Sequence, residues 1–188
     1  MNHLLKPDRK EVRARQLSRE IAFKAVYAIY LGGMELTEAI EASLDGTELS
    51  ADSLAWIREL AGPVAGGNNS WDEKYQALLS TNWPLERIAV IDKLCIRMAC
   101  CEFWNMPTIP PKVTISEYMK LAEKYSSRES AAFINGILGK VLESSPKSHW
   151  TPIDEELPAV ASPKTKVEKP AKKEKESQQS AWVIRSGD

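Results

Sequence analysis

Basic side chains near the start of the chain have the type and spacing needed to bind nucleic acid. Arg15 and Arg19 are four residues apart in the segment 13–27, so on a helix they lie on one face, one turn apart. Guanidinium groups at this spacing can bind successive phosphates and can stack on unpaired bases of single-stranded RNA. Lys10 and Arg13 lie just upstream. The charge pattern alone leaves two interpretations open, an ordinary solvated helix face, which it favours, and a nucleic-acid surface.

Charge is distributed unevenly along the 188 residues, although the formal net charge is only −1. Residues 1–20 contain six basic and three acidic side chains, whereas residues 21–143 contain eleven basic and sixteen acidic ones. Residues 144–188 contain eight basic and seven acidic side chains. Positive charge is therefore concentrated at the N-terminus, beside an acidic body.

The residues that usually carry hydrolytic or metal chemistry are scarce. The three cysteines, Cys95, Cys100 and Cys101, lie in an apolar helical stretch, which predicts buried, reduced thiols. The only two histidines, His3 and His149, lie near the chain ends, so the sequence offers neither a triad histidine inside the fold nor zinc-ligand spacing. We expect a protein that is not an enzyme and has no cofactor or metal.

Composition places the chain among globular proteins with one sizeable domain, since 43% of its residues are hydrophobic. No apolar run approaches the roughly 20 residues of a membrane span, and residues 1–10 lack the apolar stretch of a signal peptide. A cytoplasmic location is therefore expected.

Apolar residues recur with helical period throughout the body, and sustained strand-like alternation is lacking. The prediction is an all-α, compact bundle of about seven helices, which could be arranged as two packed three-helix sub-bundles. We expect a flexible basic N-terminus at 1–12, a helical domain at 13–143, and a disordered tail rich in proline, lysine and glutamate at 144–188. The predicted helices are 11–31, 35–45, 51–65, 71–80, 84–104 with an interruption around Ala89, 113–125 and 127–143.

Local signals support these boundaries. Ser70 to Glu73 and Ser126 to Glu129 both match a capping box, which predicts helix starts at about Trp71 and Ser127. Gly136 lies inside a strong helical pattern, so we interpret it as a point where a neighbouring helix approaches closely. The tryptophans of the body are interpreted as core or interhelix anchors rather than base-stacking platforms; they are Trp56, Trp71, Trp83 and Trp104.

Four segments in the second half of the chain carry a more specific signal. They are Asn82-Trp-Pro-Leu-Glu-Arg-Ile88, Ile91-Asp-Lys93, Ile109-Pro-Pro-Lys-Val113, and Lys124 to Leu138 with its Phe-Ile-Asn-Gly-Ile-Leu ending. In this order and spacing they resemble the NusB family of transcription antitermination factors. The resemblance is weaker over 13–31, and residues 32–81 match only in helical pattern.

The resemblance implies an RNA surface at the start of the first helix, where family members bind boxA, a short single-stranded element of the nascent transcript. The residues it implies as RNA-binding are Lys10, Arg13, Arg15, Arg19, Arg97 and Glu129. Gln16 and Leu17 stand where family members often have further basic residues, which predicts weaker binding or greater dependence on Lys10 and Arg13. For Glu129 the capping box alone is a sufficient alternative explanation.

A protein partner is also implied, because family members pair with NusE, the small-subunit ribosomal protein that doubles as an elongation factor. Tyr27, Asp92 and Lys93 are the expected partner-binding residues, and an acidic surface would aid encounter with a basic partner. Alternatively, Asp92 pairs with Arg87 or Lys93, or caps a helix. The implied function is antitermination on rRNA operons, with other Nus factors and RNA polymerase as indirect partners. Whether the free protein is a monomer or a homodimer stays open.

Two other functions stay open from sequence alone. One is a helical scaffold that binds only proteins, in which the arginines merely aid solubility. The other is the RNA-binding accessory domain of an RNA cytosine methyltransferase. The second is disfavoured, because the chain lacks a glycine-rich cofactor loop and the catalytic cysteine setting, and the 45 residues after Glu143 are too few for a methyltransferase domain.

Overall fold

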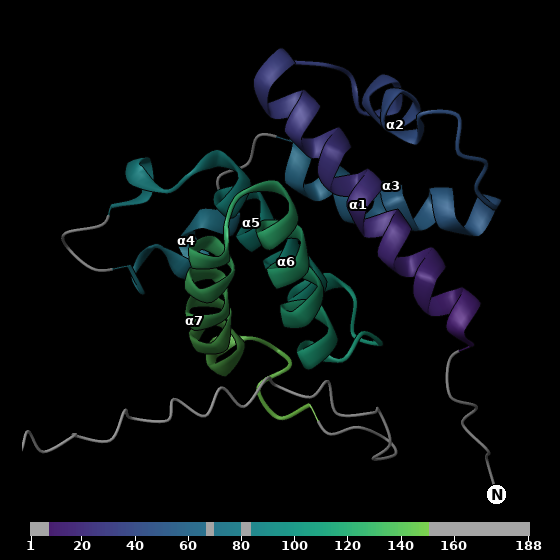
Figure 1. Ribbon diagram of the computed structural model, residues 1–188. Helices are drawn as coiled ribbons and strands as arrows, with labels where there is room; N and C mark the ends of the chain where they lie inside the picture. Colours follow the sequence, from purple (N-terminus) through teal and green to yellow (C-terminus); the bar gives the residue numbers. More distant parts are fainter. Residues whose placement is uncertain (1–7, 67–69, 80–83, 151–188) are drawn as a thin grey trace, which may run out of the picture. The chain divides into compact units, whose positions relative to one another are not determined.

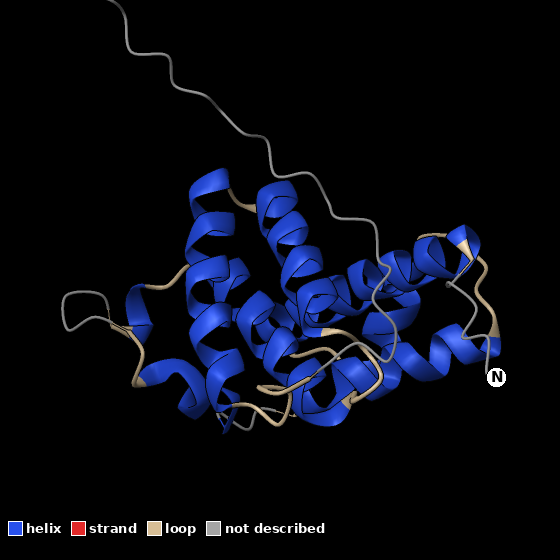
Figure 2. Cartoon of the chain, turned by 90° about the horizontal axis from the view of Figure 1, so that it is seen from below, coloured by secondary structure: helices blue, strands red, loops and turns tan. Residues whose placement is uncertain are grey.

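The structure is a computed structural model that describes residues 8–66, 70–79 and 84–150. These residues form seven α-helices and one short 3-10 helix, and the described part of the chain contains no strand (Figure 1; Figure 2). The elements are α1 (Arg9–Gly32), α2 (Leu36–Leu44), α3 (Ala51–Ala65), α4 (Ser70–Gln76), η1 (Leu85–Arg87), α5 (Val90–Asn105), α6 (Pro111–Tyr125) and α7 (Arg128–Ser144). The predicted all-α class is confirmed.

The helices pack in two groups that share α5 as a neighbour. Helix α1 packs against α2 and α3. Helix α6 packs against α7, and α6 and α7 each contact α5. Helix α4 adds contacts to α5 and α7, and α5 also contacts α1 and α3. The predicted pair of three-helix sub-bundles is therefore present, as α1–α3 and α5–α7. None of the helices in the described ranges is long and apolar enough to cross a membrane.

The predicted interruption around Ala89 is confirmed. Ile88 and Ala89 have ψ angles of 130° and 142°, so the backbone is extended between η1 and the start of α5 at Val90. The stretch before the break is a 3-10 turn over Leu85–Arg87 rather than an α-helix. The preceding Asn82 and Trp83 lie outside the described residues.

Two smaller predictions need correction. The cap of α7 is Ser127, whose Oγ accepts a hydrogen bond from the backbone N–H of Ser130 at 3.1 Å, so the helix begins at Arg128, one residue later than expected. Gly136 is exposed, and a Cβ built there would meet nothing within 4 Å. The close helix approach predicted for Gly136 is therefore wrong.

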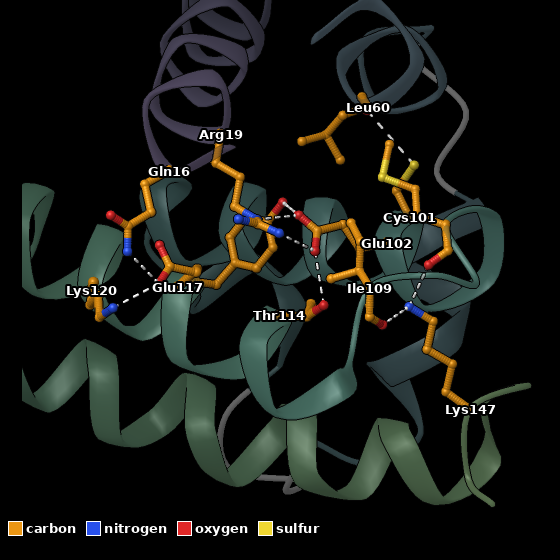
Figure 3. A network of polar contacts seen from close by, with 12 residues as sticks. Gln16, Arg19, Leu60, Cys101, Glu102, Ile109, Thr114, Glu117, Lys120 and Lys147 are labelled. Carbon is orange, nitrogen blue, oxygen red and sulfur yellow. Dashed lines mark hydrogen bonds and ion pairs between the residues drawn. The ribbon is translucent and has the colours of Figure 1, made fainter. Parts of the chain in front are cut away.

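A buried carboxylate connects α5 to α1 and α6. Glu102 of α5 is fully buried, and its Oε1 accepts a hydrogen bond from Arg19 Nε of α1 at 2.7 Å (Figure 3). Its Oε2 accepts from Arg19 Nη2 at 3.2 Å and from Thr114 Oγ1 of α6 at 2.8 Å. The hydroxyl of Tyr118, also in α6, donates to Oε1 at 2.9 Å. Four donors thus compensate the desolvation of this charge.

The ordered fold continues past the predicted boundary at Glu143. Helix α7 ends at Ser144, and Lys147 beyond it is only 3% exposed. Its Nζ donates to the carbonyls of Met106 and Ile109, both at 2.6 Å (Figure 3). Burial lowers the pKa of the Lys147 amino group to about 8, so most of it stays charged at neutral pH. The predicted tail start at Ser144 is therefore wrong for residues 144–150, while residues 1–7 and 151–188 lie outside the described residues.

Removing the buried carboxylate should destabilise the protein strongly. Glu102→Gln leaves the guanidinium of Arg19 buried without its counter-ion, so we expect the free energy of unfolding to fall by about 3–5 kcal/mol in urea denaturation. The matched control is Glu123→Gln, since Glu123 pairs with Arg128 across the surface, where the side chains are 53% and 88% exposed. This control should change stability little. Equal losses in the two variants would contradict the proposed importance of burial.

Lys147→Met tests the segment after α7. The substitution keeps an apolar stem but removes the donor to two carbonyls, and hydrogen bonds from charged groups contribute about 1.5–3 kcal/mol each. We expect the free energy of unfolding, measured by thermal or urea denaturation, to fall by at least the contribution of one such bond, about 1.5–3 kcal/mol. Lys140→Met, at an exposed position on α7, serves as the control and should unfold like the original protein.

Candidate RNA and partner interface

The first turns of α1 present three of the predicted cationic residues to solvent. Lys10, Arg13 and Arg15 are all exposed. Asp8 caps this helix, with its Oδ1 accepting a hydrogen bond from the backbone N–H of Lys10 at 3.4 Å. The guanidinium carbon of Arg15 lies 5.0 Å from the centroid of the Trp56 ring in α3. This group, Lys10, Arg13 and Arg15, is called the cationic face of α1 below.

Arg19 is not part of that exposed face, although the sequence spacing placed it beside Arg15. The residue is 3% exposed, and its guanidinium is held by two hydrogen bonds to Glu102. An RNA phosphate would have to displace a buried carboxylate to reach it. The expectation that Arg19 binds RNA directly is therefore not supported by its geometry, and its observed contacts are structural.

The two departures from the family pattern have different surroundings. Gln16 is half-buried, and its Nε2 donates to Glu117 Oε1 of α6 at 3.0 Å. Lys120 also donates to that oxygen, at 2.7 Å (Figure 3). Leu17 is 39% exposed. Gln16 thus connects α1 to α6, and neither residue adds positive charge to the cationic face of α1.

Arg97 also differs from the prediction. Its side chain is 11% exposed and donates from Nε to Asp72 Oδ1 at 2.7 Å and from Nη2 to Asp72 Oδ2 at 2.5 Å. The Tyr75 hydroxyl donates to the same carboxylate at 2.7 Å. Burial opposes ionisation of Asp72, but the hydrogen bonds from Arg97 and Tyr75 outweigh it and lower the pKa of Asp72. Arg97 is therefore engaged in fastening α4 to α5, which does not support its expected RNA contact.

A small pocket brings together Asp92 and Glu129, which the sequence had assigned to the partner and to RNA respectively. Its volume is about 250 Å³, and its other lining residues are Arg87, Ile88, Ala89, Ser130 and Phe133. Ser130 Oγ donates to Asp92 Oδ2 at 2.9 Å, whereas Oδ1 has no hydrogen-bond partner among the described residues. Burial raises the pKa of Asp92. The pocket thus offers a buried acceptor beside the exposed carboxylate of Glu129.

Tyr27 lines a separate pocket of about 310 Å³ between α1, α5 and α6. The other lining residues are Phe23, Lys24, Ile91 and Tyr125. The ring of Phe23 stacks on Tyr27 with centroids 6.3 Å apart and lies 5.2 Å from that of Tyr125. Lys93, the third expected partner residue, is half-buried on α5. The structure does not place the three expected partner residues in one pocket, although Ile91 and Asp92 bring the two pockets to adjacent positions on α5.

Glu102 shapes this region, although it was not among the site residues predicted from the sequence. Glu102 was visible as an acidic residue within the apolar stripe of α5, a position at which a buried charge needs a partner. Arg19, which the spacing placed on the surface, is the partner that Glu102 requires. Trp56 was correctly expected as an anchor, but its contact with Arg15 depends on the packing of α3 against α1, which no local pattern specifies.

Thiol and metal chemistry find little support in the described residues. All three cysteines are buried, and burial raises the pKa values of Cys100 and Cys101 to about 12 and that of Cys95 further. Protonated thiols of this kind are poor nucleophiles. The described ranges contain no group of three or more histidine, cysteine, aspartate or glutamate residues placed to hold a metal.

The arrangement defines a class: an all-helical binding protein with a cationic helix start and acidic and aromatic pockets on a shared body. Comparison with known proteins narrows this class. The model of the NusB family matches residues 16–143, and the chain belongs to the NusB family.

Curated relatives agree over most of their length. The transcription antitermination protein NusB of Sorangium cellulosum is 33% identical over 131 residues, which cover 70% of this chain and 93% of that protein. The NusB protein of Geotalea daltonii is 36% identical over 141 residues, covering 71% of this chain and 97% of the relative.

Solved structures share the fold. NusB of T. maritima superposes with a TM-score of 0.62 at 24% identity, covering 72% of this chain and 94% of that one. A chain from a complex of the antitermination factors NusB and NusE with dsRNA gives a TM-score of 0.62 at 19% identity, covering 70% and 98%. At these identities the likeness establishes the fold alone.

The ion pair between Asp72 and Arg97 should make stability depend on acid pH. Because the folded-state pKa of Asp72 lies below the ordinary value of 3.8, its carboxylate contributes stability above that pH and loses the contribution as pH falls through the folded-state pKa. Asp72→Asn should therefore be less stable than the original protein at neutral pH, with a difference that shrinks below pH 3.8. Urea unfolding of both proteins across the acid range measures this; a constant difference would argue against it.

Proposed function

We propose that this chain is a transcription antitermination factor that binds boxA-type single-stranded RNA together with NusE. Membership of the NusB family supports the proposal, and the observation that carries it is the exposed cationic face of α1. The factor acts without catalysis, in the cytoplasm, by linking the transcript of rRNA operons to RNA polymerase through NusE and other Nus factors.

In this proposal the RNA contacts are made by Lys10, Arg13 and Arg15. Their side chains are free to reach phosphates, whereas Arg19 and Arg97 act indirectly by fixing α1 and α4 to α5. The pocket beside Asp92 and Glu129 accepts N–H donors, and Glu129 limits the approach of phosphates at its rim. RNA thus meets positive charge at α1 and hydrogen-bond acceptors at the start of α7.

NusE docks on the acidic and aromatic surface of α1 and α5, with Tyr27, Asp92 and Lys93 as its contacts. The body carries excess acidic charge over residues 21–143, which complements a basic ribosomal protein and speeds encounter. The aromatic pocket at Tyr27 provides an apolar anchor point beside that charge. The alternative function, a scaffold that binds only proteins, would use this surface and leave the cationic face of α1 without a ligand.

A titration separates these functions. The full chain and its cognate NusE should form a 1:1:1 complex with a boxA oligonucleotide. Three phosphate contacts predict that log affinity falls with log salt concentration with a slope of about −2. Binding should therefore be roughly twentyfold weaker at 200 mM than at 50 mM salt. Arg15→Ala should weaken binding and reduce the slope, with unchanged thermal stability.

Lys140→Ala removes an exposed charge from α7 and is the matched control, for which RNA affinity should be unchanged. A complex with NusE that ignores boxA RNA, or binds it without salt dependence, would favour the scaffold.

A further inference from the structure

Trp56 lies against both arginines of α1 that the sequence had paired. Its ring centroid is 5.0 Å from the guanidinium carbon of Arg15 and 5.4 Å from that of Arg19. The indole belongs to α3 and is 9% exposed, so it lies at the margin of the core. These distances are within the range at which a cation is attracted by an aromatic ring.

The two guanidiniums differ in what else holds them. Arg19 is fixed by the buried carboxylate of Glu102, with hydrogen bonds of 2.7 and 3.2 Å. Arg15 is exposed and forms no ion pair among those found in the described ranges. The indole is therefore the contact that orders Arg15. The buried Glu102 therefore holds Arg19, Arg19 lies against Trp56, and Trp56 lies against the exposed Arg15.

We infer that Trp56 is a positioning residue for RNA binding: it holds the planar guanidinium of Arg15 in place, so that a phosphate or an unpaired base meets a cation that is already ordered. This inference rests on the proposed function and adds a residue that itself touches no RNA. A long side chain that is ordered before binding loses less rotamer entropy when the ligand arrives.

The chemistry of the pair explains why arginine is needed at this position. A guanidinium is planar and stacks on an aromatic ring while its N–H groups remain available to an oxyanion. A lysine ammonium has no plane to align and is strongly hydrated. Arg15→Lys should therefore keep the charge and lose the positioning. Lys74 lies 5.1 Å from the Trp104 ring in the other helical group, which provides a matched cation and indole pair away from α1.

The test is a double-mutant cycle on the full chain, with boxA RNA and cognate NusE present. Trp56→Leu should weaken RNA binding about two- to fivefold, the range expected from an exposed cation–π contact. The same substitution in an Arg15→Ala background should have no further effect. Trp56→Phe, which retains a weaker aromatic face, should restore most of the affinity, and Arg15→Lys should resemble Trp56→Leu. Trp104→Leu should leave RNA affinity unchanged.

A second readout does not depend on RNA. The Nε–Hε resonance of Arg15, assigned with the Arg15→Lys variant, should show a ring-current shift that Trp56→Phe alters and Trp104→Leu does not. Trp56→Phe keeps this measurement informative if Trp56→Leu proves too unstable to study, and circular dichroism checks folding of each variant.

The outcomes separate this inference from the proposed function. If Trp56→Leu weakens RNA binding equally with and without Arg15, Trp56 acts only through packing, and the inference fails while the proposed function stands. The inference also fails if no ring-current shift is seen in a protein that binds RNA. If the original protein with NusE does not bind boxA RNA, both the proposed function and the positioning role of Trp56 are contradicted.

Discussion

Compensation of one buried charge is the constraint on which this fold depends. Glu102 has no access to solvent, so α1 and α6 must each bring donors to the same point on α5. Such a site contributes little net stability compared with an apolar core, yet it penalises any packing that leaves the carboxylate without partners. It therefore specifies how α1 lies against the other helical group, and with it the direction in which the N-terminal cations face.

Helix α1 serves two purposes along its length. Its middle, from Ser18 to Val26, is largely buried among α2, α3 and α5. Its start, with Lys10, Arg13 and Arg15, is exposed and free to meet an anionic ligand. The buried part supplies rigidity, and the exposed part benefits because cations on a fixed helix need less ordering on binding.

Sequence predicted the helical class, the number of α-helices and the break before α5, because helical periodicity and extended backbone before a helix are local properties. It did not predict which arginines are exposed. Arg15 and Arg19 are equivalent by spacing, and only the position of Glu102, 83 residues away in the chain, separates them. Long-range pairing of this kind leaves no local pattern. For Gly136 the local pattern correctly indicated a helix, but whether another helix approaches it depends on packing, and a Cβ built there would meet nothing within 4 Å.

The lysine that follows α7 has a consequence for the order in which the protein can be completed. Lys147 satisfies the carbonyls of Met106 and Ile109 in the connection between α5 and α6. Because a chain grows on the ribosome from its N-terminus, that connection is made about forty residues before the lysine that binds it. Until Lys147 has been added, the carbonyls of Met106 and Ile109 lack their charged donor, so this connection reaches its final hydrogen bonding only after α7 has been synthesised.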